Sequence, residues 1–217
     1  MQKIYKGFSF RIAVVVYRDF DMGSNSFEIQ PFIQDVSKIE SFLKCIKVAG
    51  GGDIPEDING ALQKVINLDW QSPTRVLVHF ADAPCHGSDF HDAHDSHKNP
   101  VSDQPWEKIF SQLKSLAINY NFMEIHECTK KMTAKFSELW KGCGKSLSSK
   151  SKRFEFRVYP VNTEPLDLIK KITTSIKDSI SHSIRNMEDG DAILKHLGLA
   201  DDNHDEKLFA ELCKMTK

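Results

Sequence analysis

The stretch TRVLVHFADAPCHG, residues 74–87, passes from an apolar, β-branched run directly into turn-forming residues. Its first part, residues 74–81, predicts a strand that is buried on both faces, as in a parallel sheet. The run FSFRIAVVVY, residues 8–17, predicts a second strand of the same kind. Helical patterns come between and after these runs. Alternation of this kind predicts an α/β fold, with an open and mostly parallel sheet that helices cover.

The remaining segments continue the alternation. Residues 27–34 predict an edge strand, because Pro31 cannot donate to a sheet ladder. A helix is expected over residues 39–48 with Ser37 as its N-cap, and another is expected to begin near Pro55. Further along the chain we expect a helix at 105–118, a short strand at 122–127, a helix at 129–140, a strand at 154–161 and a helix at 166–184.

Charge and composition indicate which kinds of binding partner and which cellular compartment to expect. The 29 basic and 30 acidic residues give a net charge of −1, which gives no argument for a nucleic-acid partner. No apolar run reaches the ~18–20 residues of a membrane span, and no signal peptide is visible at the N-terminus. The 5 widely spaced cysteines are typical of free thiols in a reducing compartment. We therefore expect a cytoplasmic protein with no membrane span and no nucleic-acid partner.

Acidic residues follow the predicted strands. Asp19 comes after the first strand, Asp82 follows residues 74–81, and Asp53, Glu56 and Asp57 occupy the segment between them. Ligands of open α/β sheets bind beyond the carboxyl ends of the strands, and carboxylates suit hard cations such as Mg²⁺. Structural alternatives stay open as well, since Asp82 can cap a turn, and Asp53, Glu56 and Asp57 are typical of a helix N-terminus.

The loop after residues 74–81 is rich in side chains that bind metals. Cys85 and His86 come first, and His91, His94 and His97 then recur at every third position. A zinc site needs four ligands in a tetrahedral arrangement, but this spacing matches no established zinc pattern. Zinc is therefore not expected, although a metal-binding hydrolase that uses the three histidines stays as an alternative. Catalysis by Cys85 would need a paired base, which the adjacent His86 is badly placed to supply.

Three segments together resemble one family. They are RIAVVVYRD at 11–19, GGGDIPED at 50–57 and ADAPCHG at 81–87, with Phe90 and His91 shortly after. In order and spacing they are similar to the von Willebrand factor A (vWA) domain, in particular to vWA domains that accompany alpha-kinase catalytic domains. Three separate matches are far more specific than one short motif. The resemblance implies a vWA-like, Rossmann-type doubly wound sheet over residues 1–185. It does not cover residues 186–217, where the sequence itself predicts a helical or partly disordered tail.

The resemblance also implies a metal-ion-dependent adhesion site. In that family a DxSxS-type loop, a Thr and an Asp hold a divalent cation, usually Mg²⁺, and an acidic residue of a protein partner completes its coordination. Asp82 matches the Asp, and Asp53 can substitute for the Thr, because Ile54 stands where relatives often have it. The DxSxS loop and the central first strand have no counterpart. We therefore expect a partial site and two strands with unpaired edges, in a chain that is N-terminally truncated, a fragment, or completed by a partner.

The function that these features imply is non-catalytic. We expect a protein-interaction module with a partial adhesion site that binds Mg²⁺ weakly or not at all by itself. The alternative is that the chain is the regulatory vWA region of an alpha-kinase-type serine/threonine kinase. In either case we expect no enzymatic activity from this chain.

Overall fold

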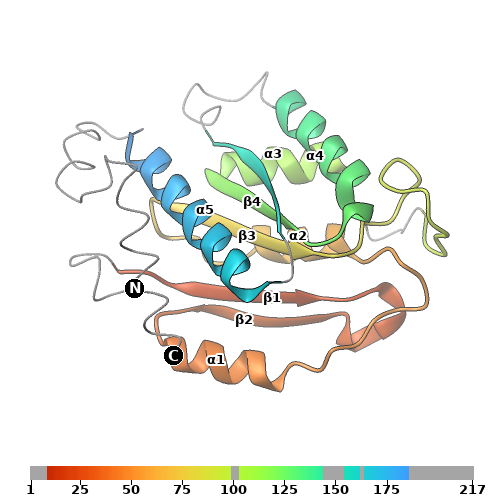
Figure 1. Ribbon diagram of the computed structural model, residues 1–217, viewed down its shortest axis with the longest axis horizontal. Helices are drawn as coiled ribbons and strands as arrows, with labels where there is room; N and C mark the ends of the chain where they lie inside the picture. Colours follow the sequence, from red (N-terminus) through yellow and green to blue (C-terminus); the bar gives the residue numbers. More distant parts are fainter. Residues whose placement is uncertain (1–8, 99–102, 144–153, 162–163, 186–217) are drawn as a thin grey trace.

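The computed structural model describes residues 9–98, 103–143, 154–161 and 164–185 (Figure 1). The predicted alternation of strands and helices is confirmed, and the chain has a mixed α/β, Rossmann-like fold. In chain order the elements are β1 (Ile12–Tyr17), the 3₁₀ segment η1 (Phe20–Asn25), β2 (Phe27–Ile33), α1 (Val36–Cys45), α2 (Ile58–Ile66), β3 (Arg75–Ala81), α3 (Trp106–Ser115), β4 (Ile118–Glu124), η2 (Glu127–Thr129), α4 (Lys130–Gly142), β5 (Phe156–Pro160) and α5 (Pro165–Arg185).

The strands form two separate sheets. β3, β4 and β5 make a parallel sheet with β4 in the middle, and β1 and β2 make an antiparallel pair in which Tyr17 lies opposite Phe27. β1 lies between β2 and β3, but among the described residues no hydrogen-bonded ladder joins β1 to β3 (Figure 1). The facing edges of β1 and β3 are therefore unpaired, as expected. The expectation of burial on both faces is wrong for two strands. All 6 residues of β1 are only partly buried, because this strand has a ladder partner on one side alone. β3 is also paired on one side alone, and its first four residues are partly buried while Phe80 is 40% exposed.

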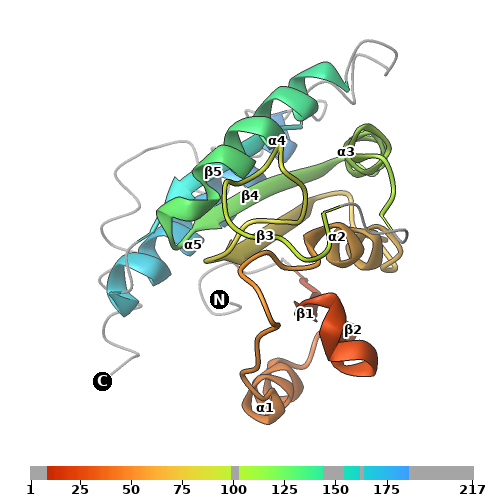
Figure 2. The same ribbon diagram turned by 90° about the vertical axis from the view of Figure 1, so that its right-hand side faces the viewer.

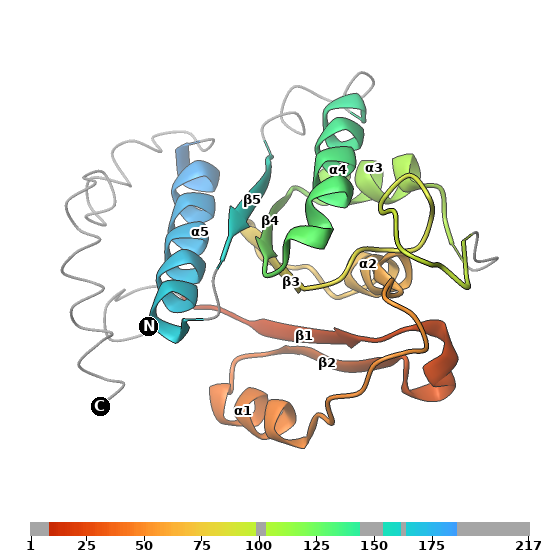
Figure 3. The same cartoon turned by 45° about the vertical axis from the view of Figure 1, so that its right-hand side comes forward.

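Helices cover both faces of the parallel sheet. α2, α3 and α4 pack side by side on one face, and α5 lies on the other (Figure 3). β4 shows the cause, because its side chains alternate between the two faces. Ile118, Tyr120 and Phe122 are fully buried in the core beneath α3 and α4, whereas Asn121 donates a hydrogen bond of 2.9 Å to Ser179 of α5. α1 packs against the β1–β2 pair, away from the parallel sheet (Figure 2).

Aromatic rings make up much of the core between the parallel sheet and the α2–α4 layer. The ring centroids of Phe110 and Phe136 are 5.0 Å apart, and those of Phe90 and Phe136 are 5.8 Å apart. Burial of a large apolar side chain contributes about 1.5–3 kcal/mol to stability. Phe90 belongs to the loop after β3, so the same core that holds the sheet also anchors that loop.

The N-caps of α1 and α2 differ from the predicted ones. Asp35 caps α1, because its Oδ1 accepts hydrogen bonds from the Ser37 amide at 3.0 Å and the Ser37 hydroxyl at 2.6 Å. α1 ends at Cys45, before the predicted end at residue 48. Asp57 caps α2 through a hydrogen bond from the third residue of the helix, so Pro55 lies in the preceding loop.

β4 begins earlier than the predicted strand at 122–127. The polar residues Asn119 and Asn121 interrupt its apolar pattern, so that pattern indicates no strand there. In the structure both are buried against the serines of α5, and Asn119 donates to Ser183 at 3.0 Å. Ala117, at φ 56°, turns the chain directly from the end of α3 into β4.

Other expectations concern the cysteines, the tail and the membrane. The described cysteines, Cys45, Cys85, Cys128 and Cys143, are free as predicted. Cys213 and the tail predicted at 186–217 lie outside the described residues, and the domain boundary at residue 185 stays a prediction. No helix in the described part of the chain is long and apolar enough to cross a membrane.

Candidate functional site

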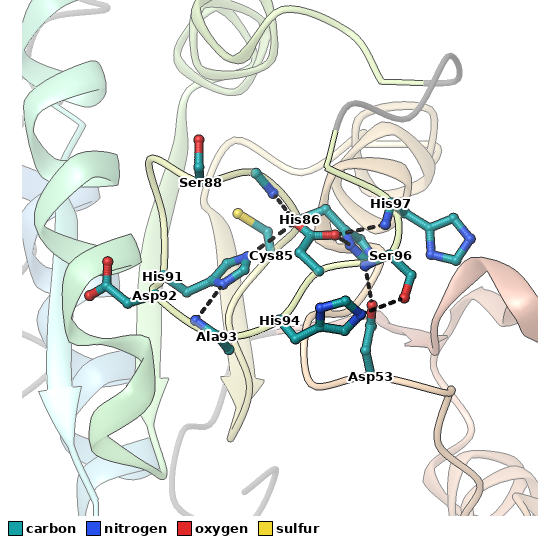
Figure 4. Close-up of polar contacts among 12 residues, drawn as sticks. Asp53, Cys85, His86, Ser88, His91, Asp92, Ala93, His94, Ser96 and His97 are labelled. Atoms are coloured by element: carbon teal, nitrogen blue, oxygen red, sulfur yellow. Dashed lines mark hydrogen bonds and ion pairs between the residues drawn. The ribbon is translucent and has the colours of Figure 1, made fainter.

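Acidic residues and histidines gather where β1 and β3 end, which is the edge at which open α/β sheets bind ligands. The turn after β1, the loop before α2 and the loop after β3 all contribute. Figure 4 shows His86, His97 and Asp53 at the place where the last two of these loops meet. We call the following six residues the rim cluster: Asp19, Asp53, Glu56, His86, Asp95 and His97.

His86 lies at the centre of the rim cluster. Its side chain is 3% exposed, with Nε2 2.8 Å from Asp19 Oδ1 and Nδ1 2.9 Å from Asp95 Oδ1. Burial by itself lowers the pKa of His86, but the hydrogen bonds to Asp95 and Asp19 outweigh burial, so the pKa is raised. Both ring nitrogens face carboxylates, and this favours the imidazolium form, in which each N–H donates to one of them.

Asp95 organises the loop after β3. Its Oδ2 accepts from the Gly87 amide at 2.8 Å, and its Oδ1 accepts from the His97 amide at 2.8 Å. Burial by itself raises the pKa of Asp95. These hydrogen bonds and the bond from His86 lower the pKa by more than burial raises it, to about 2. Asp95 is therefore a carboxylate at neutral pH, and it fixes the orientation of the His86 ring.

Several buried atoms of the rim cluster have no hydrogen-bond partner. They are Asp19 Oδ2, Asp53 Oδ1, Glu56 Oε2 and His97 Nδ1. Buried polar atoms are nearly always paired, so these atoms mark a place with unused binding capacity. Gly51 leaves the space that Asp19 occupies, since a Cβ on Gly51 would come within 2.6 Å of Asp19 Oδ2.

The rim cluster could hold a metal ion. Two groups of described residues each place three ligand atoms within 4.8 Å of one another: Asp19 with His86 and His97, and Asp53 with His86 and Asp95. Both groups use His86, so the two possible ion positions overlap at this residue. Imidazole and carboxylate ligands together suit transition metals, whereas carboxylates alone suit Mg²⁺.

Carboxylates crowd the outer side of the rim cluster. Burial, and then the charges of Asp19 and Asp82, raise the pKa of the partly buried Glu56 to about 7. Asp82 itself is exposed directly after β3, and its role as a metal ligand stays a prediction. Asp57 is not part of this group of carboxylates, because its side chain accepts from the Gly60 amide at 2.7 Å and caps α2.

The other predicted site residues lie outside the two metal-capable groups. His91 Nε2 is 3.2 Å from Asp95 Oδ2, while its Nδ1 accepts a backbone amide at 3.1 Å, so both nitrogens are in use. His94 is exposed and contacts Ser96 at 3.4 Å. Of the three evenly spaced histidines, only His97 joins a metal-capable group. Cys85 is 1% exposed, and burial raises the pKa of its thiol, as in an inert structural cysteine.

Asp95 is a residue that the sequence prediction of the site missed. It belongs to a series of acids that alternate with the histidines of the loop, and that alternation was the one available signal. Phe20 was missed as well. Its ring lies 5.1 Å from the His86 ring and 5.5 Å from the His97 ring, so it gives both histidines an apolar wall.

The fold and the rim cluster define a class: an α/β, Rossmann-like protein with acidic residues and histidines at the carboxyl ends of its strands. No protein-family model matches the chain. Over 114 residues the chain is 36% identical to the alpha-protein kinase vwkA of Dictyostelium discoideum. The match covers 51% of this chain and 18% of that protein. The chain is therefore a partial relative of an alpha-protein kinase, and it spans a small part of that relative's length.

Proposed function

We propose that this chain is a non-catalytic protein-interaction module of the vWA type, with the exposed Asp82 and the partly buried Asp53 and Glu56 of the rim cluster as its contact surface. The observation that carries the proposal is the crowding of carboxylates: in addition to burial, the charges of Asp19 and Asp82 raise the pKa of Glu56, to about 7. Crowded carboxylates favour a bound cation, and Mg²⁺ takes oxygen ligands from one or two carboxylates together with water. The resemblance to vWA domains supports the same ion, held by Asp82 and Asp53.

A protein partner would complete the coordination of this ion with an acidic side chain. Asp82 is exposed, and one oxygen of Asp53 already accepts from the Ser96 amide at 2.6 Å. The chain alone therefore offers Mg²⁺ few ligands, and we expect a dissociation constant of about 1 mM or weaker. We place the module in the cytoplasm, where free thiols such as those of this chain persist.

The similarity to the alpha-protein kinase vwkA favours a second candidate function. In this reading the chain is the regulatory region of an alpha-kinase-type protein, and its interaction surface recruits or positions the substrates of a kinase domain. Both candidates predict that the chain itself transfers no phosphate. They differ in whether binding at the rim changes the activity of a kinase.

Titration of the full chain with Mg²⁺, followed by NMR amide shifts and calorimetry, tests the proposed function. We expect weak binding that Asp82→Asn removes. Asp89→Asn is the matched control, because it makes the same change at another exposed position of the same loop, and binding should persist.

Two results would contradict the proposed function. One is Mg²⁺ binding by the chain alone that is much tighter than about 1 mM, or a Mg²⁺ response that is unchanged in Asp82→Asn. The other is phosphate transfer from labelled ATP to a protein substrate by the purified chain, since this would make the module catalytic.

A further inference from the structure

The two sheets meet at the rim cluster. Asp19 follows β1 of the antiparallel pair, whereas His86 follows β3 of the parallel sheet, and the two residues are separated by 67 positions in the chain. Their side chains are nevertheless 2.8 Å apart and almost completely buried, at 1% and 3% exposure. Since no ladder joins β1 to β3 within the described ranges, this contact connects the two sheets at their carboxyl ends.

Three side chains at this contact have the arrangement of ligands for a transition metal. The ligand atoms of Asp19, His86 and His97 all lie within 4.8 Å of one another. The ligand atoms of a tetrahedral zinc ion lie about 3.3 Å apart, so small side-chain rotations would bring these three onto one ion. The buried atoms Asp19 Oδ2 and His97 Nδ1 have no hydrogen-bond partner, and both are therefore available as ligands.

The surroundings of His86 are those of a metal-bound histidine. Such histidines almost always donate their second ring N–H to a carboxylate or carbonyl, which sets the tautomer and the ring orientation. Asp95 Oδ1 lies 2.9 Å from His86 Nδ1 and supplies this acceptor. His86 Nε2 then points to Asp19, and the Phe20 ring packs against both histidines as an apolar wall.

We propose that Asp19, His86 and His97 bind a zinc-class transition metal ion, with Asp95 as the positioning residue of His86, and that this ion clamps the antiparallel sheet to the parallel one. The ion takes the place of the proton that His86 shares with Asp19, and the proton is released to solvent. Two imidazoles favour zinc over Mg²⁺, so this site is distinct in its chemistry from the proposed Mg²⁺ surface at Asp82. Three protein ligands leave a fourth position for water.

Zinc titration of the chelator-treated full chain tests the proposal, by calorimetry and by the visible absorption of Co²⁺ used as a substitute. We expect one ion per chain, bound with micromolar affinity or better and not displaced by millimolar Mg²⁺. His97→Ala should weaken binding at least tenfold and should still fold, because the ring nitrogen Nδ1 makes no hydrogen bond. His94→Ala, which truncates an exposed histidine of the same loop, should change affinity by less than twofold.

A further variant and a stability measurement test the clamp. Asp95→Asn should lower zinc affinity by about 10- to 100-fold while the ion still binds, as expected for a residue that acts through a ligand. Zinc should raise the melting temperature of the wild type by more than that of His97→Ala at the same zinc concentration. The proposal is wrong if no stoichiometric zinc binds, if His97→Ala and His94→Ala behave alike, or if Mg²⁺ competes equally.

Discussion

Replacing Gly51 with alanine puts a methyl group into the space that the Asp19 side chain occupies. The new Cβ would lie 2.5 Å from Asp19 Cβ, 2.6 Å from Asp19 Oδ2 and 2.9 Å from Asp21 Oδ1. Real Cβ atoms essentially never come within 3.0 Å of such neighbours. Asp19 is 1% exposed and bonded to His86, so it cannot rotate away without breaking this bond between the ends of β1 and β3.

The cost of this change can be set against a favourable effect on the unfolded chain. Overpacking costs about 1–3 kcal/mol, while a Gly→Ala change lowers the entropy of the unfolded state and returns about 0.4–1 kcal/mol. We expect Gly51→Ala to be destabilised by about 1–2 kcal/mol in urea unfolding. Zinc affinity should also fall, because the displaced residue is a proposed ligand.

Gly50→Ala is the matched control for this prediction. An added Cβ at Gly50 meets nothing within 4 Å, so only the effect on the unfolded chain remains. We expect Gly50→Ala to be as stable as the wild type or about 0.4–1 kcal/mol more stable. If both variants unfold at the same urea concentration, the close approach of Gly51 to Asp19 is not present in solution and the geometry argued above is wrong.

Three further predictions concern the core and α2. The Tyr17 hydroxyl lies 2.8 Å from the buried His79 Nε2, and Tyr17→Phe leaves that nitrogen without a partner. We expect this variant to lose about 1–3 kcal/mol of stability in urea unfolding. An equal loss of stability in Tyr159→Phe, which changes a partly exposed tyrosine, would refute this prediction. Burial lowers the pKa of His79 to about 3, so the unfolded chain binds a proton at this residue below pH ~6.5 and the folded chain does not. The stability of the wild type relative to His79→Gln should then fall by about 1.4 kcal/mol per pH unit from pH ~6.5 towards 3, and a constant difference over that range would contradict the prediction. Asp57→Ala removes the N-cap of α2 and should cost about 1 kcal/mol by the same assay, whereas Asp57→Asn, which keeps an acceptor, should cost much less.

The sequence predicted those parts of the fold whose burial follows a simple pattern. β3 is apolar except for Arg75 and His79, and its position and the turn after it were predicted correctly, although its full burial was not. β4 was placed too late, because Asn119 and Asn121 resemble loop residues until they are seen beside the serines of α5. Those serines lie 58 to 64 positions further along the chain, and no local pattern records such a pairing.

The sequence predicted which residue types form the candidate site, but it did not predict which of these residues lie together in space. Asp19, His86 and His97 were each singled out, yet the sequence placed His97 with two other histidines at equal spacing. The structure separates them because Asp95 accepts from His86, His91 and the His97 amide, which turns the histidine side chains in different directions. Spacing along a loop does not show which of its residues hydrogen-bond to the same carboxylate.

The division into two sheets also affects how the molecule unfolds. Without a shared ladder, β1–β2 and β3–β5 can open at different temperatures, as separate cooperative units. The chain has 3 tryptophans, and they sample both parts. Trp70 packs 4.9 Å from Phe32 of β2, whereas Trp106 packs 4.9 Å from Phe136 over the parallel sheet. A variant that keeps only Trp70 and a variant that keeps only Trp106 would each give a fluorescence melting curve. The difference between the two melting temperatures would measure how far the folding of one sheet depends on the other.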